Sequence, residues 1–166
     1  MESKELIKAN LEATLAMVLK LAEDMKDAPL TSPTPNGGNH PMWVIGHLAY
    51  SEGAVICGLM LGEPNPHEAW KEVFANGTEP VDDASVYPPF DDVIAKLRQT
   101  NQATLKLLDS LSEEDLDQAS KNTPPQFESF FGTYRKCFMM MSNHRLMHYG
   151  QLADARRAAG REKMGV

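Results

Sequence analysis

The sequence predicts an all-α protein, built as a bundle of four long helices. Apolar side chains recur at helical spacing in four separate stretches, and no stretch shows the alternating pattern of a strand. The segments between them are dense in proline, glycine, serine and asparagine, which is typical of loops. Four amphipathic helices in 166 residues favour an antiparallel-type bundle with at least one long crossover. We expect one domain over residues 1–166, because this length suits a single core.

The first two predicted helices cover residues 4–26 and about 40–61. The first repeats leucine, isoleucine, valine and methionine on one face, and Ser3 is expected to cap it. In the second helix, the stripe that should be buried consists of Trp43, Val44, His47, Leu48, Ser51, Ala54, Val55 and Gly58. Close approach of other helices would be allowed by its small residues Gly46, Gly53, Ala54 and Gly58.

A long connection follows over residues 62–89, with five prolines and a short helix expected at "PHEAWKEVF". Connections of this length are uncommon in compact domains and often carry function. The third long helix is predicted at about residues 90–110. These two features indicate that the long crossover joins the second and third helices.

The rest of the chain contains a short helix and the last long one. The stretch "SEEDLDQ" should be opened by Ser112, with Asp115 completing a weak capping box. The last long helix is predicted at about residues 130–158, and Gly160 should end it.

Composition and charge narrow the class of protein. The apolar fraction of 42% and charged fraction of 23% are those of a soluble globular protein. The net charge of −7 does not favour nucleic acid, which usually requires a basic patch. No signal-peptide run begins the chain, and no stretch is expected to reach the roughly 20 apolar residues of a membrane span. Cys57 and Cys137 lie far apart, so we expect free thiols in a reducing cytoplasm.

Three histidines fall on stripes that should be buried. His144 and His148 are four residues apart in the last helix, so their rings lie one turn apart on the same face. Such a pair can chelate one transition metal, but the spacing alone often arises by chance. His47, on the buried stripe of the second helix, supplies a third imidazole. A metal would satisfy one nitrogen of each ring, whereas burial without one requires hydrogen-bond partners in the core; both readings stay open.

Three histidine ligands would suit a catalytic ion, because they leave a coordination position for water or substrate. All-imidazole ligation fits zinc or nickel, and also iron, copper or cobalt, whereas calcium and magnesium prefer oxygen ligands. For His40, at a helix start, and His67, in a proline-rich loop, we expect capping or surface roles.

Other residues are candidates for the surroundings of this site. Ser51, one turn after His47, could line a pocket, and Tyr50 and Gln151 could supply hydrogen bonds near the metal. Cys137 should lie about 10 Å along the helix from His144, too far to share the ion. No residue stands out as an obligatory general base, so no catalytic residue is assigned outside the three histidines.

Two segments carry a resemblance to a known family. "NHPMWVIGHLAYSEG", residues 39–53, and "NHRLMHYGQLADARRAAG", residues 143–160, resemble the W-x-x-x-H-L and H-x-x-x-H-x-G-Q-L motifs of the DinB/YfiT-like superfamily. The resemblance spans nearly the whole chain and implies a four-helix bundle with up-down-down-up topology. It also implies a nickel or zinc site on His47, His144 and His148, and often a homodimer. Members with known activity include transferases and isomerases that use small thiols such as mycothiol or bacillithiol.

Two functions from different classes are therefore expected. One is a metal-dependent enzyme that activates a bound thiol or water, as a small-thiol-dependent transferase or isomerase or as a hydrolase acting on a small molecule. The other is a non-catalytic, metal-stabilised dimeric module that binds a ligand or serves a stress response. A fourth protein ligand would favour the module, and an open metal position would favour the enzyme.

Overall fold

The computed structural model describes residues 2–34, 37–162 and 164. Within them the regular structure is helical, apart from one isolated bridge between Ala119 and Thr133. The all-α class predicted from periodicity is therefore confirmed. The long helices are α1 (Ser3–Asp24), α2 (Pro41–Gly53), α4 (Phe90–Ser110) and α6 (Tyr134–Ala158).

Shorter helical elements complete the chain. The α-helical ones are α3 (Lys71–Phe74) and α5 (Glu128–Phe131). A π-helix, η1 (Ala54–Met60), continues α2. Short 3₁₀ turns occupy η2 (Glu68–Trp70), η3 (Ala84–Val86), η4 (Asp115–Asp117) and η5 (Pro125–Phe127).

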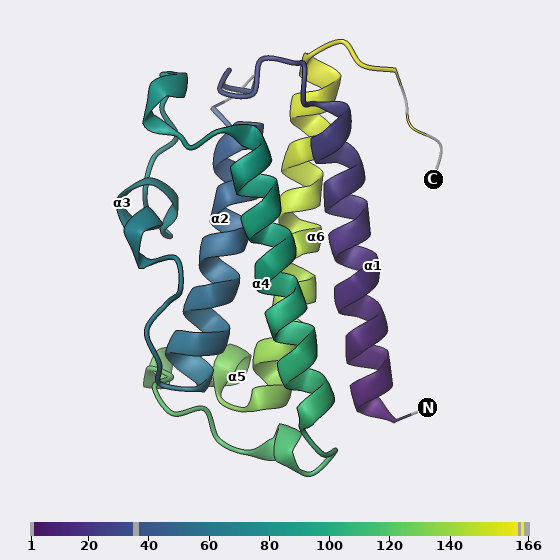
Figure 1. The fold of residues 1–166 in the computed structure, drawn as a ribbon, viewed down its shortest axis with the longest axis vertical. Helices are drawn as coiled ribbons and strands as arrows, with labels where there is room; N and C mark the ends of the chain where they lie inside the picture. The colour runs from purple at the N-terminus through teal and green to yellow at the C-terminus, as the bar shows by residue number, and fades with distance from the viewer. Residues whose placement is uncertain (1, 35–36, 163, 165–166) are drawn as a thin grey trace.

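The four long helices lie side by side (Figure 1). α1 and α6 begin at the end where the N-terminus lies, and α2 and α4 begin at the opposite end (Figure 1). α1 packs along α6, and α2 packs against α4 on one side and α6 on the other. The long connection with α3 passes along the outside of α2 (Figure 1).

Two apolar clusters fill the interior, one toward each end. The first gathers around Trp43 and Phe74, and the second around Phe138 and Met60. On each long helix, buried polar residues separate the two clusters along the sequence: Thr14 on α1, Glu52 on α2, Thr100, Asn101 and Thr104 on α4, and Ser142 and Arg145 on α6. We call these residues the polar layer.

The helix ends show where local sequence signals hold. His40 caps α2, because its Nδ1 accepts a hydrogen bond from the Trp43 amide at 3.1 Å. Ser112 and Asp115 form the expected reciprocal capping box, with bonds of 2.8 and 3.1 Å. The predicted cap at Ser3 is wrong: Ser3 is the first residue of α1, and its hydroxyl bonds Glu113 instead.

The last helix begins later than predicted and ends as expected. Residues 128–131 form the separate helix α5, and α6 starts at Tyr134, where the Thr133 hydroxyl accepts a bond from the Lys136 amide. Gly160 follows α6 with a φ of 72°, a left-handed conformation that favours glycine after a helix.

Small residues of α2 allow the long connection to pack closely. A Cβ on Gly46 would come within 2.2 Å of the Phe74 ring, and one on Gly53 within 2.4 Å of Asn65 Oδ1. Gly58, by contrast, has nothing within 4 Å of that position. Gly46 and Gly53 therefore make room for the connection rather than for another long helix.

One stretch within the described residues, Pro41–Met60, is long and apolar enough to cross a membrane by length and composition alone. The expectation that no stretch approaches a span is therefore wrong. Of the 18 residues of this stretch over which the mean hydropathy is taken, 72% are buried inside the molecule, as in a core helix of a soluble protein.

Candidate metal centre

The structure brings together His47 of α2 and His144 and His148 of α6. One ring nitrogen from each lies within 4.8 Å of the other two. The Nε2 atom of His144 is 3.2 Å from that of His47 and 3.0 Å from that of His148. In the described part of the chain, no cysteine, aspartate, glutamate or further histidine joins this group. We call these three residues the histidine cluster.

Hydrogen bonds orient two of the three rings. Nδ1 of His47 lies 2.8 Å from the Phe74 carbonyl oxygen, and Nδ1 of His148 lies 2.8 Å from Gln151 Oε1. The Gln151 oxygen also accepts a hydrogen bond from Asn39 Nδ2 at 3.3 Å. Since carbonyl oxygens only accept, both rings carry their proton on Nδ1 when neutral. Their Nε2 lone pairs are therefore free to face His144.

The three facing nitrogens suit a shared cation. Neutral His144 can place at most one proton on its Nε2, so only one of its two Nε2 contacts can be a hydrogen bond. The other contact brings two lone pairs face to face. A divalent ion accepts all three lone pairs, and the Nδ1–H bonds to Phe74 and Gln151 are the outer contacts that orient metal-bound histidines.

The cluster is kept neutral by its surroundings. His47 and His148 are buried and His144 is half-buried, and the Trp43 ring stacks on His47 with centroids 4.4 Å apart. Burial lowers the pKa of His47 to about 4. Burial, reinforced by His148 and then His47, lowers the pKa of His144 to about 3. Unprotonated imidazoles are the form that binds metal, so the site is ready at neutral pH.

The proposed pocket residues lie at different places. Ser51 Oγ is 3.4 Å from Nδ1 and 3.3 Å from Nε2 of His47, and Gln151 holds His148 as described. Tyr50 belongs to the first apolar cluster, and its backbone carbonyl bonds Asn65. Cys137 lies in the second cluster, where its thiol bonds the Phe131 carbonyl.

The two remaining histidines are buried, so the expectation of surface roles is wrong. His40 is 1% exposed, and its Nε2 lies 3.0 Å from the Val81 carbonyl oxygen. His67 is 7% exposed and bonds Thr100. Both rings are buried by tertiary packing, because the long connection lies against the bundle and covers them. The capping role of His40 is confirmed.

Sequence reasoning missed the ion pair at the centre of the bundle. Glu52 and Arg145 are each 2% exposed, and the guanidinium donates to Glu52 Oε2. The signal was present, because Glu52 is the only charged residue between positions 41 and 60. A lone charge in an apolar helix usually has a buried partner.

The comparison with known families agrees with this geometry. A family model described as the DinB superfamily matches residues 10–152, most of the chain. The matched range includes all three histidines. No curated protein matches the chain. The chain belongs to the DinB superfamily.

Proposed function

We propose that this member of the DinB superfamily is a metal-dependent enzyme with one divalent ion held by His47, His144 and His148. The observation that carries the proposal is the convergence of three Nε2 atoms, two with their lone pairs fixed by hydrogen bonds at Nδ1. Zinc and nickel suit an all-imidazole set. Three protein ligands leave a position for a substrate or co-substrate, which favours an enzyme over a structural metal site.

The bound ion would lower the pKa of a thiol or water that shares it. The residues around the ion would hold it and orient the histidine rings. The Phe74 carbonyl and Gln151 keep the Nδ1 protons in place, and Trp43 excludes water from one face of His47. Among the described residues, the side chains that hydrogen-bond the histidine cluster are those of Ser51 and Gln151, and both are uncharged. Acid–base chemistry would then rest on the activated ligand itself.

Thiol activation supports a transferase or isomerase with a low-molecular-weight thiol, and water activation supports a hydrolase. The substrate would be a small molecule, with neither nucleic acid nor membrane as partner. We further propose a single domain in a four-helix bundle of up-down-down-up topology, a homodimer and a cytoplasmic location. The directions of the long helices support the topology. The burial of Pro41–Met60 supports a protein outside the membrane, and two free cysteines suit the reducing cytoplasm.

Metal analysis of untagged protein tests the first step. We expect about one equivalent of zinc or nickel per chain, and its loss in His148→Ala. His67→Gln is the matched control, because it removes a buried imidazole outside the histidine cluster. If His148→Ala retains as much metal as the parent, the assignment of the ligands is wrong.

Turnover tests the second step separately. The metal-loaded protein is screened with small thiols and electrophilic acceptors, and with ester and amide substrates. Turnover should vanish with a chelator and return with metal. A protein that binds one metal yet shows no turnover would instead be the non-catalytic, metal-stabilised module.

A further inference from the structure

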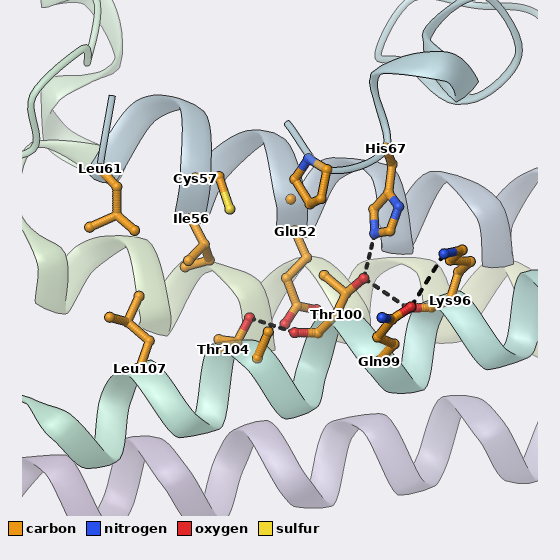
Figure 2. A pocket seen from close by; sticks show the side chains of 13 residues that line it. Glu52, Ile56, Cys57, Leu61, His67, Lys96, Gln99, Thr100, Thr104 and Leu107 are labelled. Atoms are coloured by element: carbon orange, nitrogen blue, oxygen red, sulfur yellow. Dashed lines mark hydrogen bonds between the residues drawn. The ribbon is translucent and has the colours of Figure 1, made fainter. Parts of the chain in front are cut away.

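A pocket lies between α4 and the helix formed by α2 and η1, away from the histidine cluster (Figure 2). Its volume is about 470 Å³, within the range of pockets that bind small molecules. Ile56, Leu61 and Leu107 supply an apolar wall. None of the three histidines lines it: His47 meets α6 on one side of α2, and this pocket faces α4 on another.

The polar residue of most interest in this pocket is Glu52. Figure 2 shows its side chain extending from α2 toward Thr100 and Thr104 of α4. Oε2 accepts from Arg145, but Oε1 is buried and has no hydrogen-bond partner among the described residues. A buried carboxylate oxygen without a donor is costly, so beside a cavity it marks a position for a donor, a water or a ligand group, that the described residues do not supply.

The neighbouring hydroxyls cannot be that donor. The Thr100 hydroxyl donates to the Lys96 carbonyl at 2.8 Å, so it must accept the bond from His67 Nε2 at 2.6 Å. The Thr104 hydroxyl donates to the Thr100 carbonyl at 3.1 Å. Both hydroxyl protons are therefore used within α4, and the inner part of the pocket presents acceptors.

The charges and acceptors around the pocket disfavour a charged ligand, because an anion would face the carboxylate of Glu52 and a cation would face Lys96. Arg145 already compensates the carboxylate of Glu52. Lys96 lines the pocket and bonds Gln99, so the remaining charge on the wall is positive. A cationic ligand would gain little here and would meet Lys96.

The helix that forms one wall is itself unusual. Ile56 and Cys57 lie on η1, where the backbone is π-helical. Such segments are rare and frequently occur at functional sites, because the extra residue in the turn redirects side chains.

We propose that this pocket is a second binding site, for an uncharged amphipathic molecule with a hydroxyl group, such as an aryl or alkyl alcohol. The hydroxyl donates to Glu52 Oε1, and the apolar body lies along Ile56, Leu61 and Leu107. This site is separate from the histidine cluster and does not depend on a metal.

A matched series of three probes tests the chemistry. The probes are 3-phenylpropan-1-ol, its methyl ether, which lacks the donor, and 3-phenylpropylammonium, which adds a charge. They are titrated into ¹⁵N-labelled full-length protein with a chelator present. The alcohol should shift amides in residues 52–61 and 96–107, and the ether should bind at least tenfold more weakly. Equal binding of the ether, or tighter binding of the ammonium, would overturn the proposed chemistry.

A pair of variants tests the location. Ala103 is exposed on α4 and lines the pocket, so Ala103→Trp should fill it without disturbing the core. Ala95, exposed on the same helix and absent from the lining, provides the control Ala95→Trp. We expect Ala103→Trp to lose the alcohol and Ala95→Trp to bind it as the parent does. Unchanged binding in a folded Ala103→Trp, or no shifts in the pocket at millimolar alcohol, would refute the site.

Discussion

Replacement of Arg145 by methionine should be among the most damaging substitutions in this chain. The guanidinium is 2% exposed and donates to Glu52 Oε2 and to the Leu11 carbonyl at 2.7 Å. When the Asn101 amide is oriented with its oxygen toward Arg145, the guanidinium also donates to that oxygen, at 2.8 Å. Methionine fills similar space but leaves the Glu52 charge buried and alone. Breaking such a pair from one side costs about 3–5 kcal/mol.

Urea and thermal unfolding measure this cost. In a chain of this size, about 3–5 kcal/mol corresponds to a loss of roughly 6–20 °C in Tm. The double variant Glu52→Leu/Arg145→Met should recover much of the loss, because no charge is left in the core. Arg98→Met is the control: Arg98 pairs with Glu23 on the exposed surface of the bundle, and its loss should cost no more than about 1 kcal/mol.

Two results would refute this reasoning. One is an Arg145→Met protein whose unfolding free energy lies within about 1 kcal/mol of the parent, since a broken buried pair should cost several times that. The other is a double variant whose loss of unfolding free energy equals the sum of the losses in the two single variants. The reasoning assigns the loss to one unpaired charge, and the double variant contains none.

Three further outcomes are expected. Gln151→Leu should weaken zinc binding by about 10–100-fold in calorimetric titration, because it removes the acceptor that orients a ligand ring; equal affinity would contradict that role. Gly46→Ala should destabilise the protein by about 1–3 kcal/mol in urea, because the methyl group meets the Phe74 ring, whereas Gly58→Ala should be tolerated. The metal-free protein should lose stability as the pH falls from about 6.5 toward 3. The pKa of His144 is about 3 in the folded protein and returns to its ordinary value of about 6.5 on unfolding. In this pH range the unfolded chain therefore binds a proton that the folded protein does not bind, which favours unfolding. A stability that stays flat between these two pH values would contradict this expectation.

The parts predictable from sequence are those that local patterns determine. Apolar periodicity located the long helices, and the cap at His40 and the stop at Gly160 follow from side-chain and backbone chemistry within a few residues. The histidine cluster was predictable for a related reason. His47, His144 and His148 stand on apolar stripes, where a polar ring needs a partner.

The parts that sequence reasoning missed depend on contacts between distant segments. His67 reads as a loop residue until the connection is seen packed on α4, where it meets Thr100. The pairing of Glu52 with Arg145 joins two helices whose relative rotation no local pattern specifies. The π-helical turns of η1 were also missed, because their residues continue the helical periodicity of the sequence.

The docking of Phe74 has a consequence for how such a site can diverge. The carbonyl of Phe74 holds the ring of His47, and its side chain occupies the space left by Gly46. One of the three histidines is thus oriented by the crossover rather than by the bundle. Changes in the crossover can therefore adjust the geometry and basicity of this ring while the four long helices stay as they are. Evolution can tune the reactivity of the centre through the crossover, as long as Phe74 keeps its place in the apolar core.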